Sequence, residues 1–180
     1  VSQYFEEFLE AKKNNVATTT YDNYKKRYEA HIKPDIGNIK LQNLKPYHLE
    51  QYFRKKKKNG KIRVEGGLSN NTLKKIYVLM NQCFKKADKF NVIERNPLEP
   101  IDSPQPENYE ADVLKDGEFQ KLLNTAKEND FFMFVFICTI LYTGMRKSEA
   151  LGLTWDNVNL NKNIIKVKQR LVPKRNEGAI

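Results

Sequence analysis

The chain has 180 residues and a formal net charge of +10, with 39% hydrophobic and 11% aromatic residues. This composition supports a packed core and excludes wholesale disorder, and the length suits one medium domain or two small ones. The longest apolar stretch, residues 131–142, is shorter than the ~20 residues that span a bilayer, and no signal peptide is recognisable. We therefore expect a soluble, cytoplasmic protein without a membrane partner.

The charge is concentrated in the first part of the chain. Residues 1–106 carry 21 Lys/Arg and 12 Asp/Glu, whereas residues 107–180 carry 11 and 10. Such a basic region favours a nucleic-acid partner, although a helical domain with a lysine-rich solvated face would have the same composition. Cys83 and Cys138 lie in apolar helical patterns and are expected to be buried free thiols. Two His and two scattered Cys do not suit a structural metal site.

The first part of the chain is predicted to be helical. Aromatic and aliphatic residues share one helix face near residues 4–9, and Thr18 to Thr20 offer N-caps for a second helix. Pro34 is expected to stop that second helix, and Pro46 suits the first turn of a third. The apolar stripes of the second and third helices are Tyr21, Tyr24, Tyr28 and Leu49, Tyr52, Phe53.

A basic stretch and a linker follow. Residues 54–63 are predicted to form a basic loop, and Ser69 caps the clearest helix, whose apolar residues step by three or four up to Phe90. Asn96-Pro97 breaks that helix. Residues 99–106 hold three prolines and no periodicity, which indicates a linker and a domain boundary.

The second part changes character. A helix is expected from Asp116, followed by one that is apolar on nearly all sides at 131–142, which we expect at the centre of a core. Gly144 suits the end of that helix, and a short helix is expected at 147–153. Residues 164–171 suggest a strand, and residues 173–178 suggest a hairpin turn after it.

The run from Thr143 to Asp156, TGMRKSEALGLTWD, resembles the motif around the first catalytic arginine of the tyrosine recombinases. The order of residues agrees, except that Asp156 follows Trp155 directly where the family often has one residue between. The first part resembles the family's core-binding domain, through residues 32–37 (IKPDIG), the helix start at Leu68-Ser69 and Thr72, and the closing Asn96-Pro97. The resemblance covers nearly the whole chain and is to integrases of phages and integrative elements.

The resemblance implies a mainly α fold in two parts. A helical, SAM-like core-binding domain would occupy residues 1–98, a proline-rich linker residues 99–110, and the start of an α+β catalytic domain with the beginning of a small β-hairpin residues 111–180. Family members cut one DNA strand with a tyrosine, form a 3′-phosphotyrosyl link and rejoin the strand to a partner strand. They use no cofactor, metal or small-molecule substrate, and they act on double-stranded DNA as tetramers of recombinase subunits.

Arg146 is the residue that this motif marks as catalytic. Its planar guanidinium matches two phosphate oxygens and stays charged, so it suits stabilisation of a pentavalent phosphate. Glu149 is expected to hold the guanidinium or the local helix from behind. The alternative is that Arg146 only pairs with Glu149 or Asp156 at a helix start.

Other parts of the family's site are not found in these 180 residues. His31 and His48 lie upstream of Arg146, no His-x-x-Arg follows it, and no tyrosine follows Tyr142. Lys166, Lys168 and Lys174 are candidates for the catalytic lysine by position only. We expect the chain to be a fragment, monomeric in solution, that binds DNA but does not cleave it alone. Many integrases carry an arm-binding domain before the core-binding domain, and the sequence leaves open whether one precedes residue 1.

The expected DNA contacts are polar or basic residues near helix starts or in the basic stretch. They are Thr19, Thr20, Lys55, Lys56, Ser69, Asn71, Thr72, Lys74, Lys75 and Lys147. Two other functions stay open beside the recombinase: a DNA-binding module that never catalysed, and a helical protein-interaction domain with a basic face.

Overall fold

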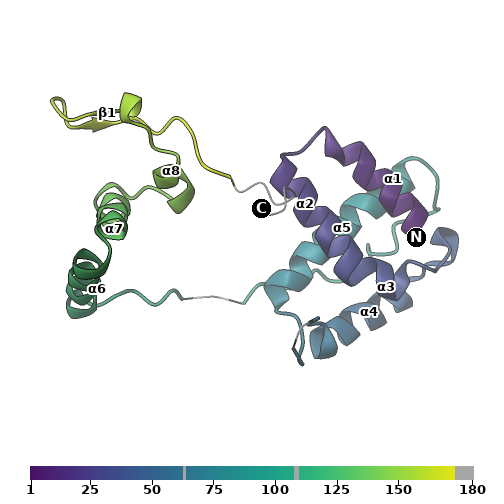
Figure 1. Cartoon of the computed structure of the whole chain (residues 1–180). Helices are drawn as coiled ribbons and strands as arrows, with labels where there is room; N and C mark the ends of the chain where they lie inside the picture. The colour runs from purple at the N-terminus through teal and green to yellow at the C-terminus, as the bar shows by residue number, and fades with distance from the viewer. Residues whose placement is uncertain (63, 108–109, 173–180) are drawn as a thin grey trace, which may run out of the picture. The chain divides into compact units, whose positions relative to one another are not determined.

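The computed structural model describes residues 1–62, 64–107 and 110–172, and it divides the chain into two compact units. They are Val1–Tyr109 and Glu110–Ile180, each described below by itself (Figure 1). Within the described residues, no helix is long and apolar enough to cross a bilayer.

The first unit is a bundle of helices around one long helix, α5 (Figure 1). Seven residues of α5 are buried, spaced so that they form one continuous face, as its apolar periodicity predicts. Phe5 of α1 stacks on Tyr28 with ring centroids 4.9 Å apart, and Leu49 and Tyr52 of α4 complete the core. The elements are α1 (Ser2–Lys13), α2 (Thr18–Arg27), η1 (Tyr28–Ile32), α3 (Lys33–Ile36), η2 (Leu41–Asn43), α4 (Pro46–Asn59) and α5 (Asn70–Lys89).

The second helix starts and ends differently from the prediction. Ala17 is the N-cap residue of α2, so Thr18 to Thr20 form its first turn and do not cap it. Pro34 does not stop the helical path, which continues through the π-helical turn η1 into α3. The path passes the proline through a π-helical turn, in which the Lys33 N–H donates to the carbonyl of Tyr28, five residues earlier. This wider turn interrupts the regular α-helical hydrogen bonds at the point where proline lacks an N–H.

The basic stretch is also more helical than predicted. Arg54 to Lys58 belong to α4, which runs to Asn59 and ends at Gly60. Straight-chain cations are good helix formers, and they are favourable near a helix C-terminus. Backbone hydrogen bonds join the two ends of the short loop that follows: the N–H groups of Gly60 and Lys61 both donate to the carbonyl of Gly66 at 3.0 Å.

The start of α5 agrees with the sequence, because Ser69 is its N-cap and the Oγ of Ser69 accepts the Thr72 N–H at 3.3 Å. After α5, Asn96 is buried and its Oδ1 accepts the Leu98 N–H at 3.0 Å. The hydroxyl of Tyr77 donates to the carbonyls of Leu98 and Ile101. Residues 98–101 are therefore fastened to the first unit. The division between the units follows Tyr109, within the stretch 99–110 that was predicted as a linker.

The second unit contains α6 (Asp116–Asn129), α7 (Phe131–Thr143), α8 (Lys147–Leu151), η3 (Trp155–Asn157), β1 (Val158–Asn159) and β2 (Ile164–Ile165). The two strands are antiparallel, with Val158 opposite Ile165. The predicted strand over 164–171 is thus wrong in length. Beyond β2 the chain runs beside α8, where Leu171 N–H donates to the Ser148 carbonyl at 2.8 Å. The expected hairpin turn at 173–178 lies outside the described residues.

The expectation that α7 forms the centre of a core is wrong for the part of the second unit that the structure describes. No residue of α7 is buried there, and the side chains of Phe131, Phe132 and Tyr142 are 69%, 71% and 80% exposed. A helix that is apolar on all sides needs neighbours on all sides, and α6, α8 and a two-residue hairpin cover only part of it. Its ends agree with the sequence: Asp130 caps it through the Met133 N–H at 3.0 Å, and Gly144 terminates it.

Candidate arginine site and nucleic-acid interface

A tight turn between α7 and α8 places Arg146. Gly144 has φ +67°, in the left-handed region that favours glycine, and its N–H donates to the Ile140 carbonyl at 2.9 Å. The hydroxyl of Thr143 accepts the Met145 N–H at 3.3 Å, and Met145 is only 7% exposed. The buried Met145 anchors the turn, so that Arg146 begins α8 as its N-cap residue.

Glu149 holds Arg146 at two points. Its Oε2 accepts the Arg146 backbone N–H at 2.9 Å, and its Oε1 accepts from Nη1 of the guanidinium at 3.1 Å. The backbone hydrogen bond and then the side-chain hydrogen bond from Arg146 lower the pKa of Glu149 below its usual value. The side chain of Glu149 is 22% exposed whereas that of Arg146 is 84% exposed. The helix-start ion pair therefore exists, and it leaves most of the guanidinium open to a ligand.

The stretch after β2 brings a further cation to α8. The Gln169 side-chain amide donates to the Gly152 carbonyl at 2.8 Å, and Leu171 bonds to Ser148 as described above. Arg170 lies between these two contacts. Its positive charge makes the smallest of the contributions that lower the pKa of Glu149. Sequence reasoning did not single out Arg170, because a predicted strand gave no reason to place it against α8. Lys147, which was expected as a DNA contact, is the first residue of α8 and is exposed.

The start of α5 gathers five of the expected contacts of the first unit within two turns. Ser69, Asn71 and Lys75 are exposed, while Thr72 and Lys74 are half-buried. Because Ser69 Oγ also lies 3.1 Å from Thr72 Oγ1, both hydroxyls belong to the cap. Thr19 and Thr20 lie in the first turn of α2, where Thr19 is exposed and Thr20 half-buried.

Lys55 and Lys56 have different surroundings although they are neighbours. Both ammonium groups contact Asp35, at 2.7 Å for Lys55 and 2.6 Å for Lys56. The side chain of Lys55 is 67% exposed, whereas those of Lys56 and Asp35 are each 10% exposed. Lys56 is therefore committed to Asp35 inside the unit and does not present its charge on the surface. This burial makes Lys56 less suited to contact DNA than Lys55.

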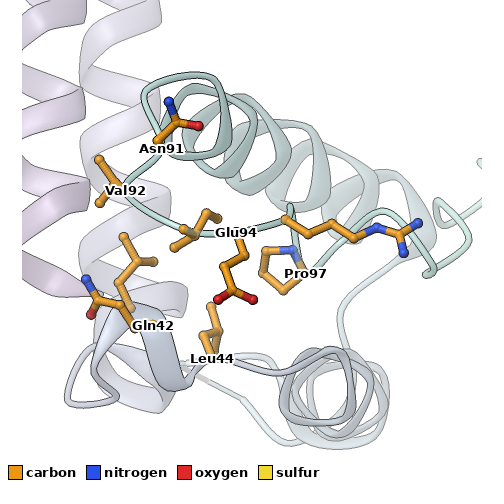
Figure 2. Close-up of a pocket in the computed structure, with 9 residues that line it drawn as sticks. Gln42, Leu44, Asn91, Val92, Glu94 and Pro97 are labelled. Carbon is orange, nitrogen blue, oxygen red and sulfur yellow. The ribbon is translucent and has the colours of Figure 1, made fainter.

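A pocket of the first unit lies between η2 and the segment after α5 (Figure 2). Its apolar walls include Leu44 and Pro97, and the carboxylate of Glu94 projects between them. Arg95 also lines this pocket, so its charged side chains do not favour a ligand of one sign. Within residues 1–62, 64–107 and 110–172, no group of three or more His, Cys, Asp or Glu side chains is arranged to hold a metal ion.

Comparison with known proteins gives consistent similarities for both units. Residues 1–58 match the phage integrase N-terminal SAM-like domain, and residues 112–178 match the phage integrase family. An integrase of Saccharopolyspora erythraea is 24% identical over 154 residues, which cover 84% of this chain and 33% of that protein. A XerC-like tyrosine recombinase of Caldanaerobacter subterraneus is 26% identical over 165 residues, covering 85% of this chain and 38% of that protein. The chain thus spans about a third of the length of these curated relatives.

Solved structures agree on the fold. A lambda integrase dimer bound to a COC′ core site matches with a TM-score of 0.75 at 14% identity, covering 88% of this chain and 55% of that chain. An integrase-like domain from Bacillus cereus matches with a TM-score of 0.51 at 23% identity, covering 62% of this chain and 89% of that domain.

Proposed function

Because the chain belongs to the phage integrase family of tyrosine recombinases, we propose that it binds duplex DNA and contributes the first arginine of a strand-exchange site. The observation that carries this proposal is the Arg146–Glu149 arrangement, in which a braced guanidinium remains 84% exposed. It occurs at the family's arginine motif, TGMRKSE.

In this function, Arg146 binds two non-bridging oxygens of the phosphate that is cut. Charge builds up on those oxygens as the phosphate becomes pentavalent, and a fixed guanidinium stabilises that charge more than it stabilises the ground state. Glu149 keeps the guanidinium in place, so little reorganisation is needed when the reaction occurs. The reaction is site-specific strand cleavage and rejoining, carried out by recombinase subunits assembled on paired DNA sites.

The first unit supplies affinity for the DNA backbone. We propose that the start of α5, with Lys74 and Lys75, and the exposed cations of α4 contact phosphates. Such contacts release counterions, so that binding weakens steeply with salt; about six neutralised phosphates would give a slope of log K against log salt near −5. The polypeptide of 180 residues is expected to bind but not to cut, since it holds neither a His-x-x-Arg after Arg146 nor a tyrosine after Tyr142.

The test is a fluorescence-anisotropy titration of a duplex of about 30 base pairs between about 50 and 200 mM salt. The Lys74→Glu/Lys75→Glu variant is compared with Lys85→Glu/Lys89→Glu, which makes the same charge change about 19 Å further along α5. Selective weakening by the first pair supports the interface at the start of α5. Equal weakening by both pairs would mean that binding depends only on the net charge of the chain. A wild-type chain that fails to bind the duplex at low salt would refute the proposal.

A further inference from the structure

The segment 169–171 is docked onto α8 by three contacts of the second unit. The Gln169 side chain binds the carbonyl of Gly152, and the Leu171 N–H binds the carbonyl of Ser148, both at 2.8 Å. Gly152 is packed so closely that a Cβ added to it would lie 3.0 Å from the Cα of Arg170. These contacts fix the backbone of Arg170 beside the helix that Arg146 begins, while the Arg170 side chain is exposed.

The exposed guanidinium of Arg146 can contact a phosphate, but the Arg146–Glu149 pair has no net charge with which to attract one. Arg146 and Glu149 form an ion pair with a formal charge of zero, and its carboxylate would repel an approaching phosphate. The hydrogen bonds of residues 169 and 171 hold Arg170 beside α8, and its charge contributes to lowering the pKa of the Glu149 carboxyl. Together, Arg146, Glu149 and Arg170 have a formal charge of +1. One phosphodiester carries a formal charge of −1 and would neutralise the group.

We propose that Arg170 is a second phosphate-binding residue of the arginine site and contacts the same DNA phosphate as Arg146. This inference rests on the proposed function and extends it to a residue that the family's arginine motif does not contain. Arg170 adds positive charge to the Arg146–Glu149 pair, in addition to that of the exposed Lys147 at the start of α8. Gly152 has a positioning role, since a Cβ at this position would lie 3.0 Å from the Arg170 Cα and the Leu171 nitrogen and would push that backbone away from α8.

The experiment is a double-mutant cycle on duplex affinity with the 180-residue chain. The variants are Arg146→Gln, Arg170→Gln and the two combined. In a matched second cycle, Lys127→Gln, at an exposed cation in the last turn of α6, replaces Arg170→Gln. When two guanidinium groups bind one phosphate, each strengthens the contact that the other makes. The fold-loss of affinity in the double variant should therefore be smaller, by about threefold or more, than the product of the two single fold-losses. Lys127→Gln combined with Arg146→Gln should give the simple product of the two losses.

A second variant tests the docking without removing a charge. Gly152→Val should displace Arg170 and weaken duplex binding about as much as Arg170→Gln does. In the double variant Gly152→Val/Arg170→Gln, binding should be no weaker than in Arg170→Gln alone. The backbone of Gly152 has φ −90°, which any residue can adopt. The substitution therefore acts by steric contact with residues 170 and 171, and not by backbone strain. Thermal unfolding followed by circular dichroism shows whether the variant remains folded.

The outcomes separate this inference from the proposed function. If the wild-type chain binds and Arg146→Gln weakens binding, but Arg170→Gln has no effect or gives the simple product, Arg170 is not part of the site and the inference is wrong. If Arg146→Gln itself changes nothing, the proposed function of the arginine site fails first. If Gly152→Val unfolds the chain, the two cycles decide the matter by themselves.

Discussion

The ammonium of Lys56 lies 2.6 Å from Oδ2 of Asp35, with both side chains only 10% exposed. Lys55 contacts the other oxygen of the same carboxylate from the surface, at 2.7 Å. Asp35 therefore joins α3 to α4 through two cations from consecutive positions. Because the ammonium of Lys56 is also 5.8 Å from the centre of the Tyr52 ring, this pair lies at the edge of the core.

Removing the carboxylate should leave a buried cation without its partner. Asp35→Asn is expected to lower the free energy of unfolding by about 3 kcal/mol, since breaking a buried pair from one side leaves an uncompensated charge. Urea unfolding followed by circular dichroism measures the loss. Lys55→Ala removes an exposed contact to the same carboxylate and should cost less than about 1 kcal/mol; equal losses for the two variants would contradict the burial of Lys56.

The same pair predicts a dependence on pH. Burial alone would raise the pKa of Asp35, but hydrogen bonds from Lys55 and Lys56 outweigh it and hold that pKa below the ordinary value of 3.8. The carboxylate thus stabilises the fold fully above pH 3.8 and loses this effect as the pH falls through the lower, folded-state pKa. The stability difference between wild type and Asp35→Asn should be constant at neutral pH and shrink below pH 3.8. A difference that grows in acid would have the wrong sign.

Two substitutions of Ser69, the N-cap residue of α5, test the stability of the fold and the proposed DNA contact separately. Ser69→Ala removes the acceptor for the Thr72 N–H and should cost about 1 kcal/mol in unfolding free energy. Ser69→Asp retains a capping oxygen but adds a negative charge at the proposed interface, so it should keep the stability and weaken duplex binding. Thermal unfolding and anisotropy measured on both variants check the two effects, and full affinity in Ser69→Asp would place this helix start away from DNA.

Arg146→Lys tests whether the shape of the guanidinium matters in addition to its charge. The ammonium of lysine keeps the charge but cannot form a forked contact with two phosphate oxygens. Affinity for the duplex should therefore fall while the salt slope remains as in wild type. Arg146→Gln should instead make the slope shallower by about 0.9, the value for one phosphate contact. If lysine restored full affinity, Arg146 would act as a point charge only.

The parts of the fold that the sequence predicted depend on local chemistry. Ser69 and Gly144 mark helix ends because one supplies a capping oxygen and the other accepts a left-handed backbone, and both act within a few residues. Arg146 and Glu149 are three residues apart on a short helix, so their contact also follows from local spacing.

The parts that were missed depend on contacts between distant residues. A run of cations such as Arg54 to Lys58 suits a helix or a loop equally, and its role in α4 is decided by Leu49 and Tyr52 packing into the core. Lys56 was expected on the surface because nothing near it in the sequence indicates Asp35, some twenty residues away. Arg170 was overlooked for the same reason, since its place depends on the hydrogen bonds from residues 169 and 171 to α8.

The two cysteines give each unit its own chemical reporter. Cys83 is fully buried in α5 of the first unit, whereas Cys138 lies half-buried in α7 of the second. Burial raises the pKa of the Cys83 thiol, so this side chain is both shielded and slow to form the reactive thiolate. A thiol reagent should therefore modify Cys138 first. Because Cys83 is reached only when the first unit opens, the rate at which Cys83 is modified would report the unfolding of that unit.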